Sequence, residues 1–147
     1  ERGLPQLVVS LHACDTATDI VLTKAAQWHA KVILSTPCCH HALARVIDCP
    51  ELAFVTDHPF LSRKLCDVLT DAARLARLDA EGYVTTAMEL TDPDDTPKNV
   101  LLRAVLDDAP DPSRLAACRE RYESIRRFLA AGDPEGARGA LPDVIYD

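Results

Sequence analysis

Two short apolar runs, separated by an amphipathic stretch, constrain the fold of this chain more than any other feature. The runs cover residues 7–11 and 31–36 and are rich in β-branched side chains. Runs of this length and composition are typical of buried strands in a parallel sheet. Residues 16–28 between them predict a helix, with one apolar face formed by Val21, Leu22, Ala25 and Trp28. Strand, helix and strand together predict a βαβ unit.

The start of that helix carries its own signal. Thr16 is followed three residues later by Asp19. A hydroxyl followed by an acidic residue at this spacing resembles a capping box, in which each side chain satisfies a backbone N–H at the helix start. We therefore expect Thr16 and Asp19 to cap the helix.

The rest of the chain continues the alternation of helices and strands. Prolines interrupt residues 37–62, which predicts a loop or broken short helices. Residues 63–80 predict a long amphipathic helix that ends at Gly82. Two strand-like runs, 83–90 and 100–106, flank a polar, turn-rich segment and predict an antiparallel hairpin.

Two helices are expected after the hairpin. Asp111 followed by Pro112 predicts the start of a long helix, and Asp133 followed by Pro134 repeats the signal before a short one. The apolar positions of the long helix step by three and four residues: Leu115, Cys118, Tyr122, Ile125 and Leu129. The pattern as a whole predicts an α/β fold in which an antiparallel hairpin closes an otherwise parallel sheet.

Composition limits the classes of function. No apolar run approaches the ~18–20 residues needed to span a bilayer, so we expect a soluble, cytoplasmic protein without membrane contact. The net charge of −7 provides no overall attraction to nucleic acid, which could bind only at a local patch. Six scattered cysteines favour reduced thiols over a disulfide scaffold.

Because a strand is expected almost immediately after Glu1, we also expect that N-terminal residues have been removed.

Polar and sulfur-containing residues follow each of the two predicted parallel strands. The first group is residues 12–15 (HACD) and the second is residues 37–41 (PCCHH). In open α/β sheets, ligands bind beyond the carboxyl ends of the strands. Paired strands lie only ~4.8 Å apart, so the two groups would meet in one crevice if these strands are neighbours.

One interpretation of this crevice is acid–base catalysis. Asp15 and His12, with His40 or His41, would orient and deprotonate a nucleophile that attacks a methyl group. The alternative is structural: Asp15 would cap the following helix, and His12 would be a packed residue at the strand end.

The cysteines allow two other interpretations. Cys38 after Pro37 could act as a thiolate nucleophile, as in cytosine-5 methyltransferases, although a buried inert cysteine is the commoner state. A zinc site could draw on the histidines and cysteines of both groups, including Cys14 and Cys39. Adjacent ligands depart from the usual zinc spacings, so a non-metal site is favoured.

The end of the hairpin loop supplies two more candidates. Lys98 could hold an anion, and Asn99 could donate and accept hydrogen bonds. The alternative is an ordinary solvated loop.

Residues 10–19 (SLHACDTATD), 37–41 (PCCHH) and 96–99 (TPKN) together resemble class I S-adenosylmethionine-dependent methyltransferases. The resemblance covers roughly residues 6–106 and is closest to the group that includes the tRNA 2′-O-methyltransferases of the Trm-thirteen type. The sheet of that family has the order 3-2-1-4-5-7-6, with the seventh strand antiparallel. The resemblance therefore implies that this chain supplies strands 4, 5, 6 and 7, in the order 4-5-7-6.

The resemblance also implies roles for residues. His12, Asp15, Cys38, His40 and His41 would be catalytic. His12, Cys14 and Asp15 would contact the cofactor, S-adenosylmethionine. Pro37, Cys39, Lys98 and Asn99 would contact the methyl acceptor, either RNA or a small molecule. Residues 1–110 would form the C-terminal half of the methyltransferase domain, and residues 111–147 a helical extension packed on it.

The chain departs from the family in its glycines. Its five glycines are Gly3, Gly82, Gly132, Gly136 and Gly139. None of them follows a predicted strand as the family's cofactor-binding loop does. We therefore expect cofactor binding to need the N-terminal half of the domain, and the exposed edge strand, residues 7–11, to form a homodimer by pairing with a second copy. A non-catalytic interaction module and a zinc-binding domain are the alternative functions.

Overall fold

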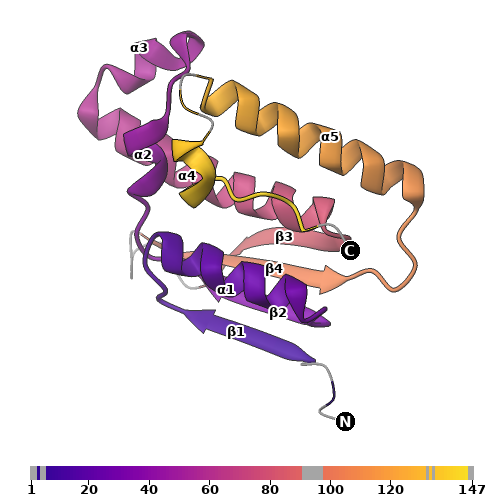
Figure 1. Cartoon of the computed structure of the whole chain (residues 1–147). Helices are drawn as coiled ribbons and strands as arrows, with labels where there is room; N and C mark the ends of the chain where they lie inside the picture. Colours follow the sequence, from indigo (N-terminus) through magenta and orange to yellow (C-terminus); the bar gives the residue numbers. More distant parts are fainter. Residues whose placement is uncertain (1–2, 4–5, 91–97, 132, 134, 146–147) are drawn as a thin grey trace.

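The computed structural model describes residues 3, 6–90, 98–131, 133 and 135–145. Its elements alternate between strands and helices along most of the chain (Figure 1). In order they are β1 (Leu7–Leu11), α1 (Thr16–Gln27), β2 (Val32–Thr36), α2 (Ala42–Val46), η1 (Pro50–Leu52), α3 (Ala53–Thr56), α4 (Pro59–Ala80), β3 (Tyr83–Glu89), β4 (Val100–Leu106), α5 (Pro112–Leu129) and η2 (Gly136–Gly139).

The four strands form one open sheet in the order β1-β2-β4-β3. β1 and β2 are parallel, whereas β4 is antiparallel to both of its neighbours, β2 and β3. If β1 to β4 are counted as strands 4 to 7, this is the predicted order 4-5-7-6 with an antiparallel last strand. The α/β fold class is confirmed.

Helices α1 and α4 cover one face of this sheet. Ile33 of β2 pairs with Ala104 of β4, so their side chains lie on the same face, and both are buried. They form one core cluster with Leu22 of α1 and Leu78 of α4. Since both helices reach the same row of strand residues, α1 and α4 lie side by side on one face of the sheet.

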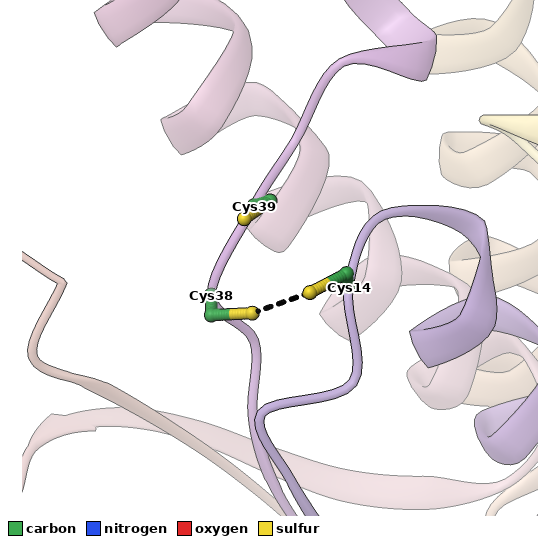
Figure 2. A group of neighbouring side chains, drawn as sticks. All are labelled: Cys14, Cys38 and Cys39. Carbon is green, nitrogen blue, oxygen red and sulfur yellow. Dashed lines mark hydrogen bonds between the residues drawn. The ribbon is translucent and has the colours of Figure 1, made fainter.

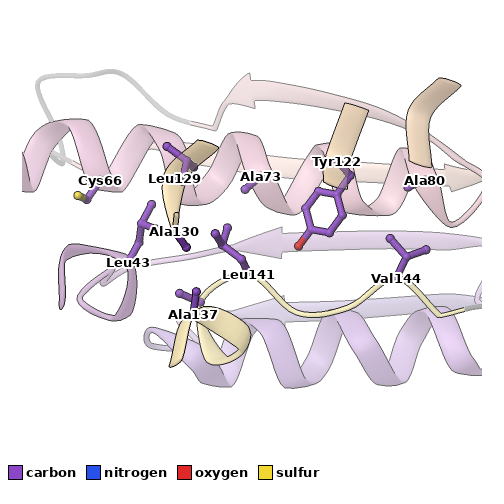
Figure 3. Close-up of a cluster of buried hydrophobic side chains, with 11 residues drawn as sticks. Leu43, Cys66, Ala73, Ala80, Tyr122, Leu129, Ala130, Ala137, Leu141 and Val144 are labelled. Atoms are coloured by element: carbon purple, nitrogen blue, oxygen red, sulfur yellow. The ribbon is translucent and has the colours of Figure 1, made fainter. Parts of the chain in front are cut away.

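A second core lies between α4, α5, α2 and the segment around η2 (Figure 3). Tyr122 and Leu129 of α5 are buried there, as the three- and four-residue stepping predicts. Leu43 of α2 and Leu141, which follows η2, complete the same cluster. α5 is therefore a further layer packed on α4. The segment after η2 packs against the core between these two helices.

No described helix covers the opposite face of the sheet, whose side chains are mostly apolar, with Arg103 and Thr86 among them. Leu7, Val9 and Leu11 of β1 are 54%, 51% and 67% exposed, and Val84 and Met88 of β3 are exposed as well. The expectation that residues 7–11 form a buried strand is therefore wrong for this strand. β1 lies at the sheet edge, and its alternate side chains point away from both helices.

Several local predictions need correction at the ends of helices. Thr16 and Asp19 form no capping box: Asp15 occupies the cap position of α1 without a side-chain bond to it, and buried Asp19 binds Arg74 instead. Trp28 lies beyond the end of α1 and is half exposed, so it is not part of the buried face. Tertiary contacts outweigh the local pattern at both positions.

The other boundaries follow the sequence more closely. α4 begins at Pro59, four residues before the predicted start, and ends before Gly82, whose φ of 94° requires glycine. The interrupted segment forms short helices, as expected. The side chain of Asp111 accepts a hydrogen bond from the Arg114 N–H at 2.8 Å and caps α5. The expected last helix is one turn of 3₁₀ helix, η2.

The hairpin strands are confirmed, but Thr96 and Pro97 in the connecting loop lie outside the described residues. Among the described helices, none combines the length and the apolar character that crossing a membrane requires.

Candidate functional site

The two polar groups predicted from the sequence meet at the carboxyl end of β1 and β2. The last residues of the two strands, Leu11 and Thr36, are register partners. Immediately beyond them, the His12 N–H donates to the Thr36 carbonyl at 3.1 Å, and the Asp15 N–H donates to the Cys39 carbonyl at 2.9 Å. Backbone bonds therefore hold loop 12–15 against loop 37–41, and the predicted convergence is confirmed.

Three cysteines come together in this loop pair (Figure 2). The sulfur atoms of Cys14, Cys38 and Cys39 all lie within 4.8 Å of one another. The Sγ atoms of Cys14 and Cys38 are 3.0 Å apart and share a hydrogen bond. All six cysteines of the chain are free thiols, as predicted.

The shared hydrogen bond separates the acidities of the two thiols. It raises the pKa of Cys14 to about 11 and lowers the pKa of Cys38 below its ordinary value. Cys38 is therefore the thiol of this pair that ionises first, and the thiolate is the nucleophilic and metal-binding form of cysteine.

Asp15 holds the second loop in place with its side chain. Its Oδ1 accepts hydrogen bonds from the N–H groups of His41 and Ala42, both at 3.0 Å, at the start of α2. Burial opposes ionisation of the carboxyl, but these two bonds outweigh it and lower the pKa of Asp15. The side chain of Asp15 therefore has a structural role. It accepts hydrogen bonds from N–H groups at the start of α2, and not from those of α1, although α1 is the helix that directly follows Asp15 in the chain.

His40 is buried, 4% exposed, at the junction of loop 37–41, α4 and the hairpin. Its Nε2 lies 2.7 Å from Oδ1 of Asp71, and its Nδ1 lies 2.7 Å from Nζ of Lys98. A lysine ammonium can only donate hydrogen bonds, so Nδ1 accepts, and Nε2 carries the proton that it donates to Asp71. These contacts fix the ring orientation and the tautomer.

Lys98 brings the end of the hairpin to the site. Besides its bond to His40, its Nζ lies 2.7 Å from Oδ2 of Asp67 on α4. Asn99 is directed differently: its Oδ1 accepts from the Leu90 N–H at 3.0 Å and closes the hairpin. The structure therefore brings Lys98, but not the side chain of Asn99, to the two loops.

A buried arginine of α4 connects this helix to α1 and to the loop that contains Asp15. Arg74 is 3% exposed and donates to both carboxylate oxygens of Asp19 at 3.0 and 2.8 Å and to Asp71 at 3.1 Å. It also donates to the backbone carbonyl of Asp15 at 2.8 Å. Burial raises the pKa of Asp19, whereas its bonds to Arg74 act in the opposite direction. The sequence analysis missed Arg74, Asp71 and Asp67; the only local signal was an acidic and basic pair three residues apart on α4.

Side chains around the second loop line a pocket of about 240 Å³. The lining residues are Cys38, Cys39, His40, His41, Arg63, Asp67 and Lys98. Four of the predicted site residues from loop 37–41 and one from the hairpin therefore share one pocket. Arg63 was not predicted as a site residue, because it appeared only as the first residue of a helix.

The remaining predicted residues lie at the margins of this pocket. His12 is exposed and has a φ of 55°, a left-handed conformation that is uncommon outside glycine. Pro37 is buried between β2 and Cys38 in the chain. His12, Cys14 and Asp15 form the edge nearest to β1, where the resemblance places the cofactor.

A comparison with known protein families gives a match on this part of the chain. Residues 2–46 match the family model described as a methyltransferase domain. The matched segment contains both β1 and β2 and the two loops that follow them. No curated protein and no solved structure is similar enough to the chain to match. Over residues 2–46 the chain is thus similar to a methyltransferase domain, and this similarity supports a transferase function.

Proposed function

We propose that this chain forms the acceptor-side half of an S-adenosylmethionine-dependent methyltransferase. The observation that carries the proposal is the match over residues 2–46, because it covers the two loops that meet beyond the parallel strands. The strand order is consistent with strands 4 to 7 of such a sheet.

The residues present suit only the margin of a cofactor site. The described glycines lie at the chain start, after α4 and in η2, and none follows β1 or β2. The turn after β1 is formed instead by His12 to Asp15, and a cofactor held there would contact His12, Cys14 and Asp15. The uncovered apolar face and the free edge of β1 suit further strands and helices that supply the rest of the cofactor site.

S-adenosylmethionine supplies an electrophilic methyl group, and the acceptor must lose a proton as it receives this group. His12 is the residue that we propose as the proton acceptor, because it is exposed at the end of β1 and histidine can take up a proton near neutral pH. Asp15 would position the second loop through the N–H groups of His41 and Ala42. His40 would act as a positioning residue, since both of its ring nitrogens have partners.

RNA is the acceptor class that we propose. Arg63 and Lys98 line the pocket, where Lys98 is paired with Asp67, and cationic side chains bind phosphate groups. This patch is local, as the net charge of −7 requires of any nucleic-acid site on this chain.

A methyl-transfer assay tests the proposal. The entire product of the gene would be incubated with S-adenosylmethionine carrying a labelled methyl group and with unmodified RNA. We expect label in RNA, a loss of roughly 100-fold or more in kcat for His12→Ala, and a higher KM for RNA in Arg63→Ala. The exposed His58→Ala, which lies outside the pocket, is the matched control. Absence of label in RNA would reject this acceptor, and full activity of His12→Ala would reject the proposed base.

A further inference from the structure

The two loops bring together three cysteines to which the methyl-transfer proposal gives no chemical step. Cys14 comes from the loop after β1, and Cys38 and Cys39 come from the loop after β2 (Figure 2). Pairing of the two strands and the backbone bond from Asp15 to Cys39 hold these loops together. The thiols are therefore brought together by the fold, although 24 positions separate Cys14 from Cys38.

We propose that Cys14, Cys38 and Cys39 bind Zn²⁺ as a three-thiolate site at the carboxyl end of β1 and β2. The site does not rest on the proposed methyltransferase function, because its test involves neither the cofactor nor the acceptor.

The spacing of the sulfur atoms suits this ion. A Zn–S bond is about 2.3 Å, so two thiolates of a tetrahedral site lie roughly 3.8 Å apart. The three Sγ atoms are all within 4.8 Å of one another, and the Cys14–Cys38 pair, at 3.0 Å, would need to widen by less than about 1 Å. Small side-chain rotations in the exposed loops are sufficient for this adjustment.

The protons of the cluster also suit metal binding. The thiols of Cys14 and Cys38 already interact with each other, and both lie within hydrogen-bond distance of the His12 carbonyl, at 3.7 and 3.5 Å. On binding, the three thiols would release their protons to solvent and Zn²⁺ would take the place of the shared proton.

The three thiols are accessible to solvent, and they would leave one coordination position of the ion open. Cys14 is exposed and the other two thiols are half-buried, so an ion can enter from solvent. Three protein ligands leave the fourth position of a tetrahedral ion for water or for another ligand. The sequence spacing counted against zinc because Cys38 and Cys39 are adjacent, but in the fold both thiols lie beside Cys14, a ligand candidate from the other loop.

Titration with Co²⁺ and Zn²⁺ tests the site on the complete 147-residue chain after full reduction of its thiols. We expect one equivalent of Co²⁺ to bind with a thiolate-to-cobalt charge-transfer absorption, and one equivalent of Zn²⁺ to displace it. Cys14→Ser, Cys38→Ser and Cys39→Ser should each weaken Zn²⁺ binding by at least about tenfold. Cys118→Ser, on the distant helix α5, should leave binding unchanged, and circular dichroism checks that every variant is folded.

Three outcomes would overturn the proposal. One is binding of Co²⁺ without the charge-transfer absorption, and another is equal Zn²⁺ affinity in all four variants. The third is mass-spectrometric evidence that the reduced cluster forms a Cys14–Cys38 disulfide in air even with Zn²⁺ present, which would identify the pair as a redox couple and not as metal ligands.

Discussion

The Nε2 atom of His40 lies 2.7 Å from the Oδ1 atom of Asp71, a contact between a loop and a helix that are 31 positions apart in the chain. Asp71 also accepts a hydrogen bond from Arg74, which in turn binds Asp19 and the carbonyl of Asp15. A continuous set of polar contacts therefore connects both loops of the site to the buried side of α4.

The first prediction concerns Asp71→Asn. Both His40 and Arg74 donate to Oδ1 of Asp71, and an amide oxygen can still accept there, but the substitution removes the negative charge from both bonds. We expect a loss of about 1.5–3 kcal/mol in the free energy of unfolding, measured with urea. ¹⁵N NMR of the wild type should show His40 with its proton on Nε2. A loss no larger than that of Asp57→Asn, an exposed control, would show that the contact contributes little.

The second prediction concerns Arg74→Met. This change leaves Asp19 buried without its main partner, which should cost about 3–5 kcal/mol at pH 7. The folded pKa of Asp19, already raised by burial, would rise further. An acid whose folded pKa lies above its unfolded value loses stability as pH rises through that interval, so the variant should be more stable near pH 5 than at pH 7.

Urea unfolding at both pH values tests this second prediction. The double variant Asp19→Asn with Arg74→Met should lose most of the added pH dependence. Arg121→Met, at an exposed position on α5, is the matched control. An equal loss for Arg74→Met at both pH values would contradict the account of Asp19.

The third prediction concerns Asp15→Ala and pH. The carboxyl of Asp15 has a lowered pKa in the folded protein because of its two backbone hydrogen bonds. Its contribution is therefore present above the unfolded pKa of about 3.9 and is lost as pH falls through the folded value. We expect Asp15→Ala to cost about 1 kcal/mol at neutral pH and much less once the pH falls below the lowered folded pKa of Asp15. A pH-independent cost in acid-unfolding curves would show that the carboxylate charge is not involved.

The pairing of β1 with β2 and the meeting of the two loops could be predicted from the sequence by rules of chain connection: parallel strands joined by one helix are usually neighbours, and their carboxyl ends share an edge. The order of all four strands was expected only from the family resemblance. The contacts of single side chains could not be predicted in this way. Asp19 had the spacing of a cap, yet its partner Arg74 lies 55 positions away, and the side chain of Asp15 satisfies the start of α2 rather than of α1.

Burial of β1 was wrongly predicted for a related reason. Its composition is that of a strand covered on both faces, but only one face meets α1. An apolar composition allows both faces of a strand to be buried. How many faces are buried depends on which helices and strands of the fold pack against it.

The fourth prediction concerns that uncovered face. We propose that the exposed edge strand β1 drives self-association of this chain, as its exposed Leu7, Val9 and Leu11 suggest. Val9→Lys should shift sedimentation profiles from dimer to monomer. Ile20→Lys, on the exposed side of α1, should not change them. A wild-type chain that sediments as a monomer at all concentrations would contradict this proposal.

The central claim, that the chain provides one half of a cofactor-dependent methyltransferase, is tested most directly by calorimetric titration of S-adenosylhomocysteine. The titration would be made into the 147-residue chain and, separately, into the entire product of its gene. We predict heat of binding from the entire product and none from the 147-residue chain alone. Absence of binding to the entire product would contradict the assignment of the cofactor, and tight binding to the 147-residue chain would contradict the placement of most of the cofactor site outside it.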